Sequence, residues 1–137
     1  MVFTVNGIVW SIQFVSSNSS YLMREDGTQT IGMTNVITHT IYLSDRLHGT
    51  MLDKVLTHEL VHCIFFSYDI IVDNDLEEKI AQWVSVYGRE VVYLLDDLME
   101  VMQKKARANS RLKTLNLLSK LKTNLPHNLP SKSKMLR

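Results

Sequence analysis

The chain has 137 residues, of which 45% are hydrophobic and 21% charged, an ordinary composition for one globular domain. That length can form a core without covalent staples, and the only cysteine, Cys63, excludes an internal disulfide and a CxxC zinc ribbon. No apolar run reaches the roughly 20 residues that span a bilayer, and no basic segment followed by an apolar one opens the chain. We therefore expect no signal peptide and a cytoplasmic location, in the host cytoplasm if a phage encodes the chain.

The net charge of +1 conceals a division of charge along the chain. Residues 1–100 contain 14 acidic and 5 basic side chains, whereas residues 101–137 contain 10 basic and no acidic ones. A block of one sign is typical of a solvated or interacting tail. We therefore expect one domain over residues 1–105, followed by a basic C-terminal helix and tail over residues 106–137.

The N-terminal third has the composition of short β-strands. The β-branched and aromatic runs Val2–Val5 and Ile8–Val15 are separated by Asn6-Gly7, a strong signal for a tight hairpin. A further short strand is expected around Gln29–Ile31, and the clearest later strand is Thr38–Leu43. These segments predict a small, mainly antiparallel sheet of three to four strands.

Two long helices are expected after the strands. The first begins near Gly49–Leu52 and ends near Ser67. The second extends from about Asp75, with Asn74 or Asp75 as its N-cap, to about Lys105. Apolar residues in the second step by three or four, as in an amphipathic helix. A weaker amphipathic stretch follows at residues 109–121. The predicted fold is α+β, with the sheet packed on the two long helices and a basic tail helix beyond them.

The first of these helices contains the motif His58-Glu59-Leu60-Val61-His62. On a helix, residues four apart lie on one face, so His58 and His62 can direct two ring nitrogens at one Zn²⁺ ion. Glu59 leaves the helix next to the first histidine, within reach of a proton on a zinc-bound water. The pattern predicts a zinc site with Glu59 as the general base.

A catalytic zinc site usually takes three protein ligands and a water. Glu77 and Glu78, in the first turn of the second helix, are the candidates for the third ligand. We favour Glu78, because Gln82 lies four residues on and could hydrogen-bond a ligand histidine. Glu77 has Ala81 at the equivalent place, and at least one of the two acids is expected only to complement the positive end of the helix dipole.

The motif at 58–62, followed by Glu78 in Glu78-Lys79-Ile80-Ala81-Gln82, resembles the gluzincin metallopeptidases, whose HExxH is followed by a ligand glutamate on the next helix. The short chain is also similar to the ImmA/IrrE-like metallopeptidases of phages and mobile elements. The resemblance covers residues from about 2 to 105. It departs from the pattern at Gln82, where such families often have Asp or Asn.

The resemblance implies a zinc-dependent hydrolase that cleaves a peptide or protein substrate, as an endopeptidase. It also implies an edge strand before the metal helix that pairs with an extended substrate, and Thr38–Leu43 fits that place. The residues expected along the substrate are then His39, Thr40, Ile41 and Tyr42. A donor for the tetrahedral oxyanion would complete the site, and the candidates are His39, Tyr68 and Tyr87.

The alternative is a non-catalytic binding protein, in which a metal staples the fold and the basic tail carries the function. Lysines and arginines interleaved with leucines over residues 107–122 could contact nucleic acid, an acidic partner or an anionic membrane. No aromatic residue follows Tyr93, so bases would have no side chain to stack on in the tail. We therefore expect the tail to be solvated and the peptidase function to hold.

Overall fold

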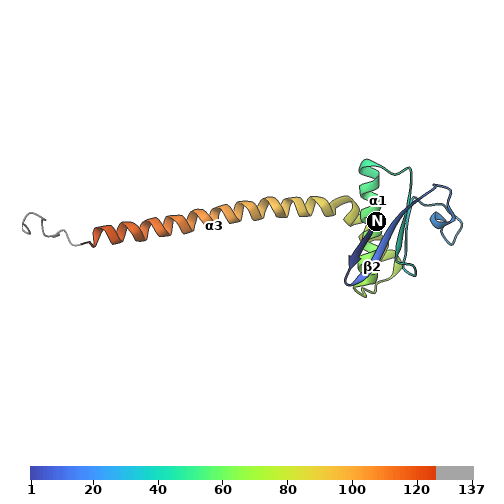
Figure 1. Cartoon of the computed structure of the whole chain (residues 1–137), viewed down its shortest axis with the longest axis horizontal. Helices are drawn as coiled ribbons and strands as arrows, with labels where there is room; N and C mark the ends of the chain where they lie inside the picture. Colours follow the sequence, from blue (N-terminus) through green and yellow to red (C-terminus); the bar gives the residue numbers. More distant parts are fainter. Residues whose placement is uncertain (126–137) are drawn as a thin grey trace, which may run out of the picture. The chain divides into compact units, whose positions relative to one another are not determined.

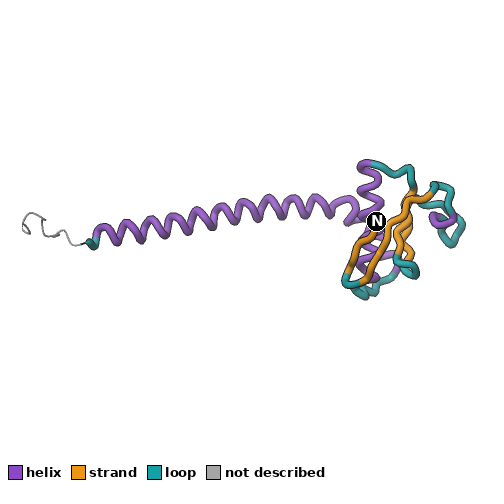
Figure 2. Tube along the Cα trace, viewed as in Figure 1, coloured by secondary structure: helices purple, strands orange, loops and turns teal. Residues whose placement is uncertain are grey.

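The computed structural model describes residues 1–125 of the chain, and its architecture is α+β (Figure 1). It divides into two compact units, residues 1–92 and a second unit that begins at Tyr93. The first unit contains a four-stranded sheet, helices α1 (Gly49–Ser67) and α2 (Asn74–Trp83), and the start of helix α3 (Arg89–Thr123). In the second unit, the described structure is almost entirely the remainder of α3 (Figure 2).

The sheet is mixed, and its strands lie in the order β1, β2, β4 (Thr40–Ser44) and β3 (Gly32–Asn35). Strands β1 (Val2–Val5) and β2 (Ile8–Val15) form the expected antiparallel hairpin, in which Asn6 and Gly7 both have positive φ angles, 46° and 78°. Strand β4 pairs antiparallel with β3 but parallel with β2. The expectation of a mainly antiparallel sheet is thus met by two of the three strand pairs. The parallel pair arises because β3 enters the sheet one position away from β2, and β4 then turns back from β3 into the place between them.

Strand β4 (Thr40–Ser44) lies inside the sheet, so the prediction that Thr38–Leu43 forms an edge strand is wrong. Thr40, Ile41 and Tyr42 are buried and paired on both sides, and His39 precedes the strand. The edge strand next to β4 is β3 (Gly32–Asn35), and β1 forms the opposite edge. The expected strand at residues 29–31 therefore lies a few residues too early; Gln29 makes only an isolated bridge with Met23.

The core of the first unit lies between the sheet and α1 (Figure 1). Trp10 and Ile41 from the sheet are fully buried against Cys63 of α1. The indole nitrogen of Trp10 donates a hydrogen bond of 2.9 Å to the hydroxyl of Ser67, at the end of α1. Because α1 is anchored to the sheet along its length, the residues on its other faces are held at fixed positions relative to the strands.

Beyond α1 the helical segments follow one another directly. The N-cap of α2 is Asp73, whose carboxylate accepts a hydrogen bond of 2.8 Å from the amide of Leu76. This cap lies one residue before Asn74, the earlier of the two predicted caps. A π-helical turn, η2 (Val84–Gly88), joins α2 to α3. The helix continues to Thr123, through the predicted end near residue 105, because neither Gly nor Pro interrupts residues 89–123.

The boundary between the compact units falls after Val92. Every residue from 91 to 125 is exposed. The last residues of the predicted tail, 126–137, lie outside the described part of the chain. None of the helices within residues 1–125 is both long and apolar enough to cross a membrane.

Candidate metal centre

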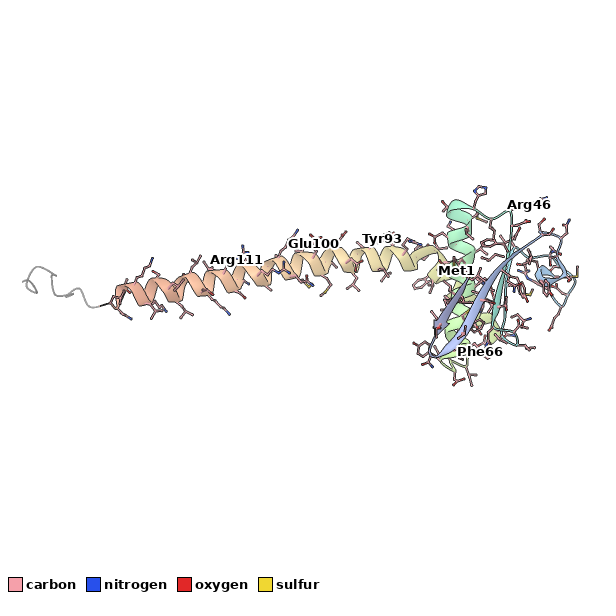
Figure 3. The ribbon with its side chains drawn as sticks, viewed as in Figure 1. Met1, Arg46, Phe66, Tyr93, Glu100 and Arg111 are labelled. Carbon is pink, nitrogen blue, oxygen red and sulfur yellow. The ribbon has the colours of Figure 1, made fainter. Side chains whose placement is uncertain are left out.

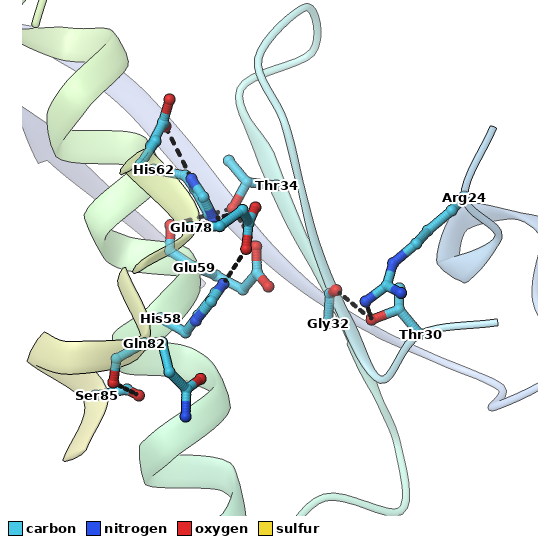
Figure 4. A network of polar contacts seen from close by, with 11 residues as sticks. Arg24, Thr30, Gly32, Thr34, His58, Glu59, His62, Glu78, Gln82 and Ser85 are labelled. Atoms are coloured by element: carbon cyan, nitrogen blue, oxygen red, sulfur yellow. Dashed lines mark hydrogen bonds and ion pairs between the residues drawn. The ribbon is translucent and has the colours of Figure 1, made fainter. Parts of the chain in front are cut away.

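The two histidines of the sequence motif lie on one face of α1, as their spacing predicts. Their ring centroids are 5.1 Å apart, and the side chains of His58 and His62 are 21% and 15% exposed. This partial burial restricts the rings while leaving the face that carries them open to a ligand. Figure 4 shows both rings directed from α1 toward Glu78.

Helix α2 brings the Glu78 carboxylate against both rings. Its Oε2 lies 3.1 Å from His58 Nε2, and its Oε1 lies 3.3 Å from His62 Nε2. The packing that allows this approach includes Ala81, whose small side chain is fully buried. His58, His62 and Glu78 thus offer three ligand atoms that all lie within 4.8 Å of one another.

These separations fit a divalent ion. Two ligand atoms held about 2.0–2.2 Å from a tetrahedral Zn²⁺ lie about 3.4 Å apart, close to the separations of the Glu78 oxygens from the two histidine nitrogens. Two imidazoles and one carboxylate are also the donor set of zinc sites that keep an open fourth position. The three residues therefore have both the chemistry and the spacing of a metal site.

Glu77 lies on the other side of His62. Its Oε1 is 2.8 Å from His62 Nδ1, and its side chain is only 23% exposed. A carboxylate at this nitrogen fixes the orientation of the ring and leaves Nε2 to face a metal. Successive acids of α2 thus contact the two nitrogens of one ring, an arrangement that the sequence pattern does not predict.

Gln82, the residue expected to support a ligand histidine, does not reach either ring. Within residues 1–125, its side chain makes no hydrogen bond, and its backbone carbonyl accepts one from Ser85 at 2.7 Å. Figure 4 shows Gln82 beside Ser85 and directed away from His62. Glu77, rather than Gln82, contacts a candidate ligand histidine from behind.

Glu59, the expected general base, is only 7% exposed and packs beneath strand β3. The Thr34 hydroxyl lies 2.7 Å from Glu59 Oε2 and 3.1 Å from the Glu59 carbonyl oxygen. Thr34 therefore ties the edge strand to the motif helix at its acidic residue. No sequence pattern marked Thr34, which stands in a segment without periodicity.

Gly32 makes room for this contact. A Cβ atom there would lie 2.5 Å from Val55 Cγ1 and 3.4 Å from Glu59 Oε1, closer than packed atoms allow in the first case. The absence of a side chain at Gly32 lets β3 approach α1 closely enough for Thr34 to reach Glu59. One glycine thus places the edge strand beside the acid of the motif.

A cleft of about 750 Å³ opens next to the three candidate ligands. His58 and Glu78 form part of its wall, together with Ile80 and Trp83 of α2. Trp83 is 71% exposed, so its indole provides a broad apolar surface within reach of the site. The cleft can accept an apolar group of moderate size beside a ligand on the metal face.

Comparisons of the chain with protein-family models, curated proteins and solved structures give no match.

The three expected oxyanion donors lie in different places. His39 packs against the rings of Trp10 and Phe66, with centroids 5.0 and 5.4 Å away. Tyr68 is the C-cap of α1 and is exposed. Tyr87 packs against Trp83, with centroids 5.8 Å apart, which places it closest to the cleft wall. Their contacts give none of the three a role at the candidate ligands.

Cys63 follows His62 in the chain but belongs to the core. It is fully buried, and this burial, together with the nearby Glu59, raises the pKa of its thiol to about 12. A thiol held in that neutral form is a small apolar core residue rather than a metal ligand.

Proposed function

We propose that this protein is a zinc-dependent peptidase whose metal is held by His58, His62 and Glu78. The observation that supports this most strongly is the approach of the Glu78 carboxylate to both histidine Nε2 atoms, beside a buried carboxylate that is not among the three. A metal site that only stabilised the fold would need no acid such as Glu59 next to its ligands. The relationship to gluzincins, including the ImmA/IrrE-like group, belongs to this proposal.

A Zn²⁺ ion bound there would polarise the scissile carbonyl and lower the pKa of a water molecule toward about 7. Glu59 accepts a proton from the attacking water and delivers it to the departing amine. The hydroxyl of Thr34, 2.7 Å from Glu59 Oε2, holds that carboxylate in one rotamer. Glu77 keeps His62 oriented through Nδ1.

The proposed substrate is an extended peptide that pairs with the outer edge of β3. The amide of Ser44 donates to the carbonyl of Ile31, so Ile31 faces β4 and, by the alternation of an antiparallel pair, Gly32 and Thr34 direct their backbone groups outward. The Thr30 hydroxyl already reaches the Gly32 carbonyl at 3.1 Å, consistent with this direction. A peptide can add to such an edge through its backbone.

The cleft beside the site suggests which side chain the substrate presents. Ile80 and Trp83 give its wall an apolar character, next to His58 and Glu78. A peptide bound along β3 would place a large apolar residue there, adjacent to the bond that is cleaved. We therefore propose a preference for peptides with an aromatic or aliphatic residue beside the cleavage site.

The test compares the zinc-loaded wild type with Glu59→Gln on an unbiased peptide library read by mass spectrometry. Glu59→Gln should keep its zinc and lose cleavage by about 100-fold or more, since a positioned general base contributes about 10²–10⁴ in rate. The exposed Glu25, substituted in the same way, is the matched control and should leave cleavage unchanged. Equal cleavage by Glu59→Gln and wild type, or no cleavage by the zinc-loaded wild type, would contradict the proposal.

A further inference from the structure

Helix α3 exposes a row of large apolar side chains. The exposed fractions along residues 91–115 of this row lie between 51% and 62%. The row consists of Val91, Leu94, Leu98, Val101, Leu112 and Leu115. Figure 3 shows the side chains that project from α3 around Glu100 and Arg111. An exposed row of large apolar side chains usually marks a site of association.

The row repeats every seven residues. Val91, Leu98 and Leu112 occupy one position of the heptad, and the second apolar position is three residues later in each case, as in a coiled coil. In the heptad between Val101 and Leu112, Lys105 and Ala108 stand at these two positions in place of large apolar residues. The pattern therefore predicts a helical partner that packs along the same stripe.

The charged residues beside the stripe identify that partner. One heptad position lies directly before residues 91, 98, 105 and 112. It is acidic in the N-terminal half of the helix, at Glu90 and Asp97. It is basic in the C-terminal half, at Lys104 and Arg111. All four are exposed. A helix with this order of charges is complementary to a second copy of itself that runs in the opposite direction.

We propose that α3 of one copy packs antiparallel against α3 of a second copy. In one register of this pairing, Leu98 lies against Val101 of the second copy. The same register sets Leu95 beside Met102 of the second copy, so these two exposed apolar residues at the margin of the stripe also meet. Core and flank thus agree on one alignment.

The charges agree with that alignment too. It places Asp97 beside Lys104 of the second copy and Glu90 beside Arg111, and each pair forms twice because the two copies are equivalent. Lys104 already pairs with Glu100 of its own helix at 2.7 Å, and both side chains are largely exposed, so it can turn to a second acid.

A parallel pairing fits less well. It would set Lys105 opposite Lys105 of the second copy in the core of the stripe, and would bring the acidic halves of the two helices together. In the antiparallel register, the aliphatic stem of Lys105 covers Leu94 instead. The antiparallel arrangement therefore avoids a repulsion that the parallel one contains.

Sedimentation equilibrium of the full chain tests the pairing. The wild type should be a dimer, and Asp97→Lys or Lys104→Asp alone should weaken it about tenfold, because two pairs change from attraction to repulsion. The double variant Asp97→Lys/Lys104→Asp should restore the affinity. Asp96→Lys, one residue outside the contact row, is the matched control and should have no effect.

Spin labels test the direction. Cysteines replace Gln103 and Leu117 one at a time, in a Cys63→Ala background that removes the native thiol. At 1.5 Å of rise per residue, antiparallel copies put the two labels at position 117 about 50 Å apart, whereas those at 103 stay within about 30 Å. Parallel copies would give similar short distances at both positions.

A wild-type chain that stays monomeric at the highest concentration tested would overturn the proposal, as would short distances at both labelled positions. Failure of the double charge variant to recover would overturn the stated register. A monomer that binds phosphatidylserine vesicles or duplex DNA through the same helix would assign the stripe to that partner and also overturn the proposal. None of these results depends on peptidase activity.

Discussion

The hydroxyl of Thr34 lies 2.7 Å from Glu59 Oε2 and connects the edge strand β3 to the helix that carries both candidate ligand histidines. Because β3 is also the proposed site of substrate pairing, this contact couples the place where a peptide would lie to the acid that would activate water. Glu59 is 7% exposed, so little water can reach its carboxylate to replace the Thr34 hydroxyl.

Replacement of Thr34 by Val should lower kcat about tenfold while KM and zinc content stay nearly constant, because a hydrogen bond to a charged group is worth about 1.5–3 kcal/mol. Thr34→Ser keeps the hydroxyl and should recover most of the rate. Thr38→Val, at an exposed threonine, is the control. Steady-state kinetics on a cleaved library peptide provides the measurement; an unchanged kcat in Thr34→Val would show that the contact is only structural.

Glu77→Gln should weaken zinc binding by about 10–100-fold, because a carboxylate on a ligand histidine fixes the ring and raises its basicity. Gln82→Ala should leave zinc affinity unchanged, since the Gln82 side chain makes no hydrogen bond within residues 1–125. Competition titration with a chromogenic chelator measures both. A larger loss of affinity in Gln82→Ala than in Glu77→Gln would reverse the assignment.

Gly32→Ala should destabilise the fold by about 1–3 kcal/mol, because the added Cβ would lie 2.5 Å from Val55 Cγ1. The φ angle of Gly32 is outside the left-handed region, so the cost is steric. Val55→Ala removes the clashing methyl, and the double variant should lose less than the sum of the single losses. Urea denaturation of the wild type, the two single variants and the double variant measures the four free energies of unfolding. A double-variant loss equal to the sum of the single losses would argue against a tight contact between β3 and α1.

The sequence alone was sufficient for the local elements. The hairpin over residues 2–15 and the helix over residues 49–67 have the predicted bounds, because turn chemistry and helical spacing are encoded within each segment. The four-residue spacing of the two histidines also predicted their shared face. What local patterns cannot encode is pairing between distant segments. Strand β4 was therefore mistaken for an edge, although β3 covers its open side.

The same limit applies to the site. Glu77 and Glu78 were recognised as candidates, but which nitrogen each one meets depends on how α2 packs against α1. Thr34 was missed because its contact crosses 25 residues of sequence. A glycine next to a short strand was the only available signal, and its meaning depends on the closeness of Val55.

The most direct test of the central claim is anomalous diffraction at the zinc edge from crystals of the zinc-loaded protein. We expect a single peak within about 2.0–2.2 Å of His58 Nε2, His62 Nε2 and a Glu78 carboxylate oxygen. A zinc-loaded crystal with no peak between these three residues, or with its only peak elsewhere, would contradict the account.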